Sequence, residues 1–186
     1  MEEYFDILDE SGMPSGQTAP RSEVHRKGLY HRTVHIWLIK EGKLLLQRRS
    51  ADKDSFPSRL DISSAGHIDA GEEPLKAAVR ELSEELGISA KPSELMYVGN
   101  TERHYINRFH GEIFDDRELA FVYLYTGKFS LSDINVQESE ISDTGLYTVD
   151  EAMTLAADDN EPLDPHELEL LIHNPYVMDM LKNNID

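Results

Sequence analysis

Residues 66–88 read GHIDAGEEPLKAAVRELSEELGI. The second half of this stretch predicts a helix from Pro74 to Leu86, because proline favours the first turn of a helix and Gly87 stands just past the end. At about 100° per residue, the apolar side chains of this helix fall on one stripe: Leu75, Val79, Leu82 and Leu86. We expect this stripe to face the hydrophobic core.

Three glutamates crowd another side of the same helix. Glu81, Glu84 and Glu85 occupy a sector only about 100° wide, and like charges four residues apart destabilise a helix by a few tenths of a kcal/mol. Helix formation does not favour this arrangement, so a cation is expected beside it. Carboxylate oxygens suit Mg²⁺ or Mn²⁺, which bridge substrate phosphates. The alternative is an ordinary solvated acidic face.

The stretch also has a recognisable pattern, G-x5-E-x7-R-E-U-x-E-E-x-G-U, where U is apolar. Its fixed positions are Gly66, Glu72, Arg80, Glu81, Leu82, Glu84, Glu85, Gly87 and Ile88. This resembles the Nudix box without a departure. The resemblance implies an α+β fold, an αβα sandwich with a mixed β-sheet, and a hydrolase that cleaves a diphosphate bond with the help of a divalent metal.

The resemblance implies catalytic and metal-binding roles for the three glutamates. Glu84 and Glu85 are expected to bind Mg²⁺ or Mn²⁺, and Glu81 to bind it directly or through water. The carbonyl of Gly66 is expected to be a further ligand. Metal held between glutamates and a diphosphate neutralises developing charge and activates water.

Other residues of the pattern, and of a later loop, are given supporting roles. Glu72 and Arg80 are expected to orient the helix by ion pairing, with Arg80 also near substrate. In the family a general base is often supplied from a later loop, and Glu138 and Glu140 are the candidates here. The alternative for these two is a solvated acidic loop.

Three cations precede the box in a strongly acidic chain: Arg48, Arg49 and Lys53. We expect them to bind the phosphates of the substrate. The alternative is charge that protects the end of a β-hairpin. Trp37, Phe56, Tyr105 and Phe109 are candidates for lining the cleft or stacking on a base, although aromatic residues are more often core.

A second resemblance, to the isopentenyl-diphosphate isomerase branch of the superfamily, extends beyond the box. It rests on Glu23-Val24-His25, His31, Trp37, the run from Gln47 to Lys53, and Ala65-Gly66-His67. It implies that Arg49 and Lys53 contact diphosphate, and that five residues form a metal site: His25, His31, His67, Asp116 and Glu118. The alternative for the histidines is a hydrogen-bonded structural role.

One departure from that branch affects the chemistry. The isomerase has a catalytic cysteine before its Gly-His pair, where this chain has Ala65, and there is no cysteine elsewhere. Alanine cannot exchange protons with substrate. The leading hypothesis is therefore a pyrophosphohydrolase that cleaves a nucleoside diphosphate linked to another moiety, or a related diphosphate compound. The alternatives are an isomerase-like enzyme and a non-catalytic nucleotide-binding module.

The rest of the chain reads as short strands followed by helices. Alternation in Thr33 to Ile39 places Val34, Ile36 and Leu38 on one face, and we expect this strand to form a hairpin with Lys43 to Arg49. Further strands are expected at Leu60 to Ser64, Glu94 to Thr101, Leu119 to Tyr125 and Gly145 to Val149. Helices are expected at Asp150 to Ala157, Pro165 to His173 and Pro175 to Leu181.

Length and composition set the remaining expectations. The 186 residues suit one domain over 1–186, with an arm or hairpin over 1–30 and C-terminal helices over 150–186. A net charge of −18 disfavours nucleic acid and anionic lipid as partners. The acidic N-terminus and the lack of a long apolar run predict a cytoplasmic protein. The expected partner is a small diphosphate substrate, and a homodimer is a further expectation.

Overall fold

Two four-stranded β-sheets form the centre of the protein, for which the computed structural model describes residues 2–158 and 161–183. The first sheet has the order β7-β3-β9-β8, with β3 and β9 parallel and the other neighbours antiparallel. Its strands are β3 (His31–Trp37), β7 (Ser64–His67), β8 (Leu95–Phe109) and β9 (Glu112–Tyr125). The second sheet consists of β4 (Ile39–Lys40), β5 (Lys43–Arg49), β6 (Leu60–Asp61) and β10 (Ile141–Tyr147).

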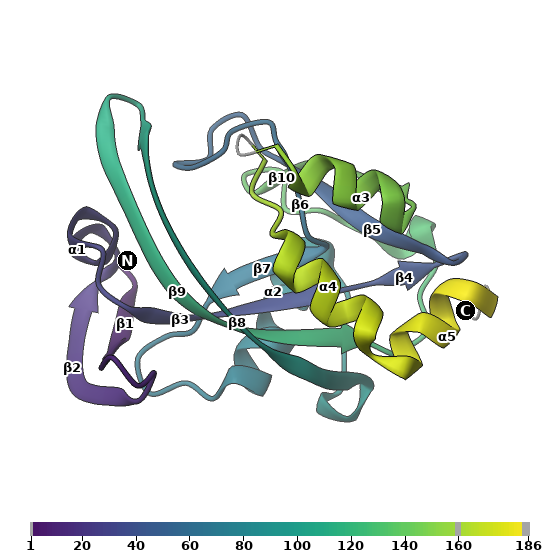
Figure 1. The fold of residues 1–186 in the computed structure, drawn as a ribbon, viewed down its shortest axis with the longest axis horizontal. Helices are drawn as coiled ribbons and strands as arrows, with labels where there is room; N and C mark the ends of the chain where they lie inside the picture. The colour runs from purple at the N-terminus through teal and green to yellow at the C-terminus, as the bar shows by residue number, and fades with distance from the viewer. Residues whose placement is uncertain (1, 159–160, 184–186) are drawn as a thin grey trace.

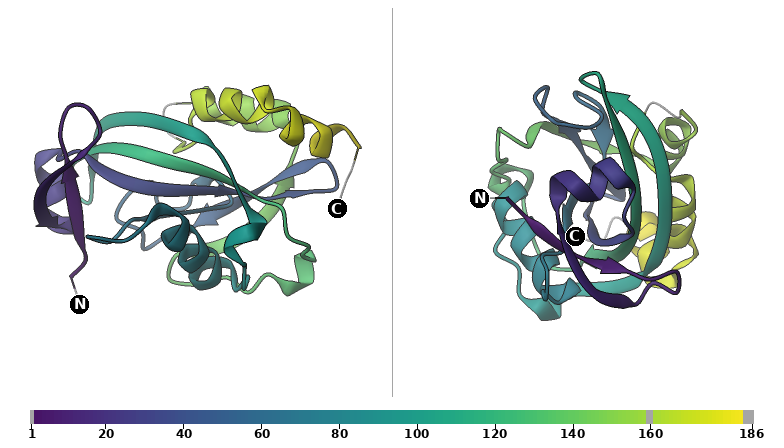
Figure 2. Two further views of the ribbon diagram at one scale, coloured as in Figure 1. Left: turned by 90° about the horizontal axis from the view of Figure 1, so that it is seen from below. Right: turned by 90° about the vertical axis from the view of Figure 1, so that its left-hand side faces the viewer.

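Helices cover the sheets on two sides (Figure 2). On one side lies α2 (Pro74–Leu86), and on the other lie α3 (Val149–Ala156), α4 (Pro165–His173) and α5 (Pro175–Asn183). One buried apolar cluster includes Leu82 and Leu86 of α2, and a second includes Leu168 and Leu171 of α4. This is the α+β, αβα sandwich with a mixed sheet that the sequence predicted. The short 3-10 turns are η1 (Pro92–Glu94) and η2 (Leu131–Asp133).

Strand β3 is buried on both faces. Val34, Ile36 and Leu38 lie in the core beneath α2, as their alternation predicted. The opposite face carries His31, Thr33, His35 and Trp37, which are all buried as well. A polar row at two-residue spacing, pointing away from the α2 core, therefore runs along the middle of the sheet.

The expected hairpin between Thr33 to Ile39 and Lys43 to Arg49 forms only at its tip. Both edges of β3 are already paired, one with β7 and the other with β9, so no edge remains for β5. The chain instead leaves the first sheet after Trp37, and only Ile39 and Lys40 pair with β5. Glu41 and Gly42 make the turn, both with positive φ.

Two other expectations needed adjustment. The strand expected over Leu60 to Ser64 is divided between β6 and β7, which belong to different sheets. Strands β8 and β9 are much longer than expected and form the hairpin that projects from the sheet in Figure 1. Its outer half, residues 102–118, is rich in exposed polar residues, so it lacks the apolar alternation from which a strand is predicted.

The N-terminal segment folds over one end of the first sheet (Figure 1). Strands β1 (Tyr4–Leu8) and β2 (Pro14–Pro20) pair antiparallel, and α1 (Arg21–Lys27) follows directly. The sequence did not predict α1. None of the helices in the described residues is long and apolar enough to cross a membrane. That residues 1–186 make up a single domain stays a prediction.

Candidate active site

The three glutamates of α2 lie at a cavity of about 240 Å³ between the sheets. Glu81 and Glu85 are buried, with 8% and 5% of their surface exposed, whereas Glu84 is exposed at the rim. The apolar stripe of α2 turns Leu82 and Leu86 into the core, which fixes the direction of the glutamates. The helix has the bounds that the sequence predicted.

Burial makes two of these carboxyl groups weak acids. The pKa of Glu85 is raised to about 8, by burial first and by the neighbouring Glu81 second. Burial also raises the pKa of Glu81 to about 7, against the opposing charge of Arg80. Glu85 accepts hydrogen bonds from Ser64 Oγ at 2.7 Å and from the backbone N–H of Ala65 at 3.1 Å. A buried pair of this kind attracts a divalent cation, which removes the cost of charging both groups.

Gly66 is placed against Glu81 so closely that no side chain fits. A Cβ at this position would lie 2.0 Å from the carboxyl carbon of Glu81. The glycine therefore lets the backbone of β7 approach the carboxylates. This contact brings the predicted carbonyl ligand and the predicted carboxylate ligand to the same place.

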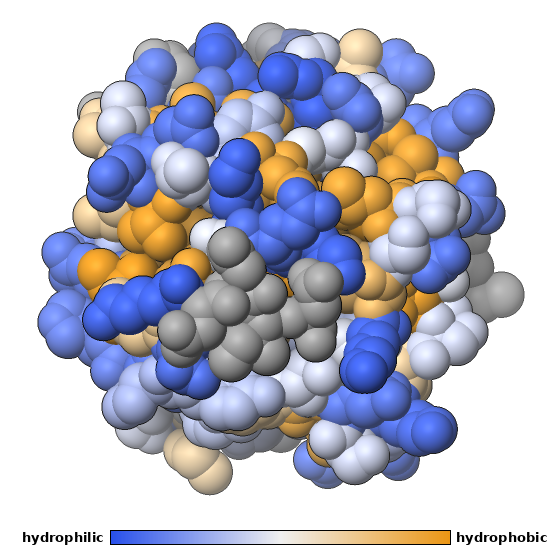
Figure 3. Space-filling model, turned by 90° about the vertical axis from the view of Figure 1, so that its right-hand side faces the viewer, coloured by the Kyte–Doolittle hydropathy of each residue, from blue (hydrophilic) through white to orange (hydrophobic). Residues whose placement is uncertain are grey.

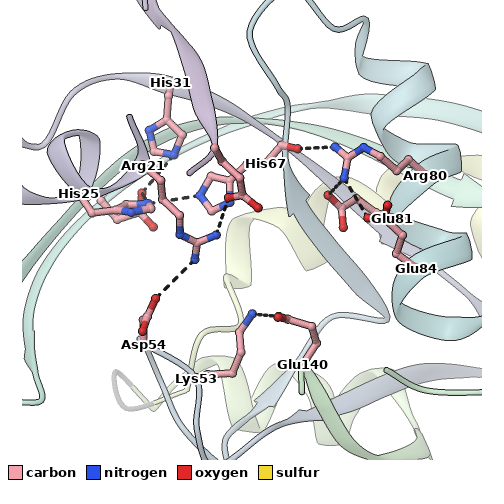
Figure 4. Close-up of polar contacts among 12 residues, drawn as sticks. Arg21, His25, His31, Lys53, Asp54, His67, Arg80, Glu81, Glu84 and Glu140 are labelled. Carbon is pink, nitrogen blue, oxygen red and sulfur yellow. Dashed lines mark hydrogen bonds and ion pairs between the residues drawn. The ribbon is translucent and has the colours of Figure 1, made fainter. Parts of the chain in front are cut away.

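Arg80 ties the box together (Figure 4). Its guanidinium donates to Glu72 Oε2 at 2.9 Å, to Glu81 Oε1 at 2.6 Å and to the carbonyl oxygen of His67 at 2.9 Å. It also reaches Glu84 Oε2 at 3.2 Å. These bonds hold α2 against β7, which is consistent with the supporting role expected for Glu72 and Arg80.

Of the three cations before the box, two line the cavity. Lys53 forms an ion pair with Glu140 across the cavity, and Arg49 donates to Asp61 Oδ2 at 2.9 Å. Arg48 is outside the lining and donates to the carbonyl of Ser58. The structure thus brings Arg49 and Lys53 to the carboxylates, but not Arg48.

The two candidate bases differ in position. Glu140 lines the cavity, and Figure 4 shows its carboxylate directed at Lys53. Glu138 is exposed and does not line the cavity. Gln137, which the sequence analysis did not single out, does line it.

The three histidines meet on the other side of the cavity from α2 (Figure 4). His25 comes from α1, His31 from β3 and His67 from β7, and ligand atoms of all three lie within 4.8 Å of one another. The Nε2 atoms of His25 and His67 are 3.2 Å apart. In a second group, formed by His31, Asp116 and Glu118, the ligand atoms also lie within 4.8 Å of one another. All five residues named by the second resemblance therefore converge.

The protonation states of this cluster fit a metal site. Burial lowers the pKa of His25 to about 4 and lowers those of His31 and His67, and a neutral imidazole is the form that binds metal. His31 Nδ1 donates to the carbonyl of Leu29 at 3.0 Å, so its lone pair lies on Nε2.

Two atoms of the cluster lack partners. His31 Nε2 and Asp116 Oδ1 are buried and, among residues 2–158 and 161–183, have no hydrogen-bond partner, although they are 3.6 Å apart. Two buried acceptors that face one another without a hydrogen-bond donor destabilise the folded protein. The donor set and these two atoms fit a divalent transition metal such as Mn²⁺.

Phe5 was not singled out by the sequence analysis, yet it covers the histidines. Its ring is fully buried and lies parallel to that of His67, with centroids 4.4 Å apart. It also stacks on His31 at 5.6 Å. Only the short apolar patch at the N-terminus signalled a buried strand, and nothing in it indicated contact with residues 26 and 62 positions away.

A buried polar group at the far end of the cavity was also missed. Glu167 of α4 is 2% exposed, accepts from Trp37 Nε1 at 2.6 Å and pairs with His35 Nδ1 at 2.6 Å. Burial alone would lower the pKa of His35, but the charges of Glu167, Glu118 and Asp61, with the hydrogen bond to Glu167, together outweigh it and raise the pKa to about 9. The signal available was the polar alternation of His31, Thr33 and His35 on β3.

The profile of the NUDIX domain matches residues 29–168, which include the helix with the three glutamates, the cavity strands and the first four residues of α4. The chain belongs to the Nudix family. Hydrolysis of diphosphate bonds is the activity of this family, and divalent metals generally serve it. The Nudix hydrolase that the box predicted is thereby confirmed at the level of the family.

Relatives agree with both resemblances. An uncharacterized Nudix hydrolase of Clostridium acetobutylicum is 41% identical over 154 residues, covering 81% of this chain and 72% of that protein. An isopentenyl-diphosphate Delta-isomerase of Streptomyces avermitilis is 33% identical over 149 residues, covering 79% and 72%. A solved structure from Deinococcus radiodurans matches with a TM-score of 0.65 at 20% identity, covering 90% and 98%, which shows the shared fold.

The similarity to the isomerase makes the position of Ala65 informative. Ala65 lines the cavity beside Gly66, where the branch has its catalytic cysteine. The chain therefore keeps the scaffold of that branch without its thiol.

Proposed function

We propose that this Nudix hydrolase cleaves a nucleoside diphosphate linked to another moiety, or a related diphosphate compound, with Mg²⁺ or Mn²⁺. The observation that carries the proposal is the convergence of the α2 glutamates with two cations, Lys53 and Arg49, on one cavity. Carboxylates suit the metal and cations suit the phosphates, and a diphosphate is the ligand that needs both.

Glu81, Glu84, Glu85 and the carbonyl of Gly66 would hold the metal. When bound, a divalent ion would offset the charge of the diphosphate and lower the pKa of a bound water. The buried position of Glu81 and Glu85 keeps these carboxylates away from bulk water, so their charge is little screened.

The five residues His25, His31, His67, Asp116 and Glu118 would hold a second ion. Their chemistry differs from that of the α2 glutamates, since three imidazoles suit Mn²⁺ or another transition metal better than Mg²⁺. The orphaned atoms His31 Nε2 and Asp116 Oδ1 support this proposal.

The cations of the cavity position the substrate. Lys53 and Arg49 would donate to phosphate oxygens, and the fixed fork of Arg49 is already ordered by Asp61 and Ser55. Arg80, held by Glu72, also lines the cavity.

Glu140 is the base we propose. It pairs with Lys53 in this structure, and a diphosphate that binds Lys53 would release the Glu140 carboxylate. The carboxylate could then accept the proton of the attacking water as the water oxygen bonds to phosphorus and the bridging P–O bond breaks.

Release of phosphate-containing products by the pure protein tests the proposal. The substrates are nucleoside diphosphates and triphosphates, nucleotide sugars, dinucleotides, coenzyme A and prenyl diphosphates, each with Mg²⁺ or Mn²⁺. We expect turnover that depends on metal and falls by at least about 100-fold in Glu85→Gln. Glu73→Gln is the matched control, because Glu73 is exposed at the start of α2 and lies outside the cavity.

The same experiment separates the alternatives. An isomerase would exchange the protons of isopentenyl diphosphate in D₂O, which NMR detects, and Ala65 argues against this outcome. A binding module would bind a nucleotide without turnover in the wild type. Unchanged turnover in Glu85→Gln would contradict the role given to the box.

A further inference from the structure

The cavity continues past Ala65 into an inner pocket, which we define by Thr33 and His35 of β3, Arg103 of β8, Glu118 of β9 and Glu167 of α4. These side chains lie at the end of the cavity away from α2, and the proposed function uses only one of them, Glu118. The strand register brings Arg103 and Glu118 together, because they pair across β8 and β9. Thr33 and His35 follow on β3 two and four residues after His31, which pairs with Glu118.

The inner pocket is fixed in place by a buried hydrogen-bonded group. Glu167 binds the ring nitrogens of both Trp37 and His35 at 2.6 Å. His35 Nε2 faces Glu118 Oε1 at 3.9 Å, which is beyond hydrogen-bond distance. The Nδ1 edge of His35 is therefore anchored, while its Nε2 edge remains available to a ligand. The Glu118 carboxylate, which the proposed function gives to the second ion, forms the boundary between the pocket and that ion's site.

Thr33 contributes a hydroxyl group to the inner pocket. It is 4% exposed and lines the cavity, and its Oγ1 has no hydrogen-bond partner in the described part of the chain. An unpaired buried hydroxyl costs free energy. A ligand hydroxyl at this point would remove that cost.

Arg103 supplies a cation from the opposite wall. Its guanidinium donates to the carbonyl of Pro162 and lies 4.8 Å above the ring of Tyr105. These contacts orient the side chain and still leave N–H donors of the five that an arginine carries.

We infer that the inner pocket of Thr33, His35, Arg103, Glu118 and Glu167 binds a hydroxyl-rich group, such as a sugar or ribosyl unit, attached to the diphosphate. Hydroxyl groups both donate and accept hydrogen bonds, so the several hydroxyls of one sugar pair with the Arg103 and His35 donors and with the Thr33 hydroxyl. This inference rests on the proposed function and adds the chemistry of the moiety beyond the phosphates.

A prenyl chain does not suit the same pocket. Packing hydrocarbon against these polar groups would remove water from them and return no hydrogen bond, which is costly for each group. A site that pairs with ligand hydroxyls rejects a ligand without them by large factors. Apolar residues also line the cavity, among them Ile62, Ala65 and Pro162, but they cannot pair with the polar groups of the pocket.

A comparison of two ligand types tests the inference. ADP-ribose and UDP-glucose carry hydroxyl-rich groups, whereas isopentenyl diphosphate carries hydrocarbon. With Mg²⁺ we expect kcat/KM for the better of the first two to exceed that for isopentenyl diphosphate by at least about 100-fold. A wild type that hydrolyses isopentenyl diphosphate as well or better would overturn the inference and leave the hydrolase in place.

Two variants locate the preference in the inner pocket. Thr33→Val, which keeps shape and removes the hydroxyl, should lower kcat/KM for the hydroxyl-rich substrate about three- to tenfold and leave that for isopentenyl diphosphate unchanged. Glu167→Gln, which weakens the anchor of His35, should reduce further the ratio of kcat/KM for the hydroxyl-rich substrate to that for isopentenyl diphosphate. Glu169→Gln on the exposed side of the same helix is the matched control. Equal losses on both substrates in Thr33→Val would overturn the inference.

A protein without turnover on any diphosphate would refute the proposed function and still allow a test of the pocket. Calorimetric titration with ADP-ribose and isopentenyl diphosphate then measures binding directly. Tighter binding of ADP-ribose, weakened by Thr33→Val, supports the inference. Equal or tighter binding of isopentenyl diphosphate overturns it.

Discussion

Glu85 is a carboxyl group whose burial links the stability of the metal-free protein to pH. Its pKa is about 8 in the folded protein, against an ordinary value of 4.5. Between these values the folded state binds the proton and the unfolded state does not, so stability falls as pH rises. The slope for this group approaches about 1.4 kcal/mol per pH unit.

Comparison of the wild type with Glu85→Gln isolates this effect. In EDTA, we expect urea denaturation at pH 5.5, 6.5 and 7.5 to show the glutamine variant gaining stability relative to the wild type as pH rises. Glutamine does not titrate, so in the variant no ionisation at position 85 stabilises the unfolded state as pH rises. A stability difference that stays constant over this range would contradict the raised pKa.

Gly66 is the second residue with a sharp expectation. In Gly66→Ala the new Cβ would collide with the carboxyl group of Glu81, which must then move. We expect hydrolysis to fall by at least about tenfold while circular dichroism stays unchanged, because one displaced ligand weakens metal binding.

A double variant distinguishes this collision from general damage. Glu81→Ala removes the group that the new methyl meets, so adding Gly66→Ala to it should cost little further stability. Additive losses of stability in the double variant would mean that Gly66 is needed for another reason.

At the scale of elements, the sequence was most informative where one segment determined its own structure. Pro74 and Gly87 define the ends of α2, and the stripe through Leu82 and Leu86 defines its buried face. Pairing between strands depends on which edges are free, and β3 has none after β7 and β9 join it. Local alternation carries no information on which edges are free, so the expected hairpin forms only at its tip, over Ile39 and Lys40.

The candidate site shows the same contrast between what one segment determines and what depends on contacts between segments. The α2 glutamates were found from one helix, and the histidines only through the resemblance, since they come from three elements. The sequence did not indicate the roles of Phe5 and Glu167, because each acts through a contact with residues more than 20 positions away. Contacts of this kind become visible only when the strands are placed.

The N-terminal hairpin acts as a cover for the histidine cluster through Phe5. Phe5→Leu keeps the strand apolar and removes the stacking on His67 and His31. We expect the affinity of this site for Mn²⁺ to fall about three- to tenfold, since aromatic pairs contribute about 0.5–1.5 kcal/mol beyond burial. Electron paramagnetic resonance of added Mn²⁺ measures this without reference to activity.

Tyr4→Leu provides the control for that measurement. Tyr4 is adjacent on β1 but half exposed, at 51%, so its change should leave Mn²⁺ binding intact. Equal effects from both variants would mean that the hairpin is needed only for stability.

At the scale of the whole molecule, negative charge is concentrated where cations are expected. The net charge is −18, and the surface seen in Figure 3 is mainly hydrophilic, with hydrophobic side chains in separate patches. Inside, Glu81 and Glu85 of α2 line the same cavity as Asp116 and Glu118 of β9. Folding the metal-free chain therefore works against repulsion at two places.

Divalent metal should consequently stabilise the fold itself. A ligand that binds only the folded state at 100 times its Kd adds about 2.7 kcal/mol, which corresponds to a rise in Tm of roughly 5–10 °C for a chain of this size. Scanning calorimetry after removal of metal with EDTA, followed by addition of Mg²⁺ or Mn²⁺, measures the rise. Sodium chloride at equal ionic strength controls for screening, and Glu81→Gln combined with Glu85→Gln should lose most of the Mg²⁺ effect. If sodium chloride raised Tm as much as Mg²⁺ and Mn²⁺ did, the cavity would hold no specific metal site, and the charge of the chain would need another explanation.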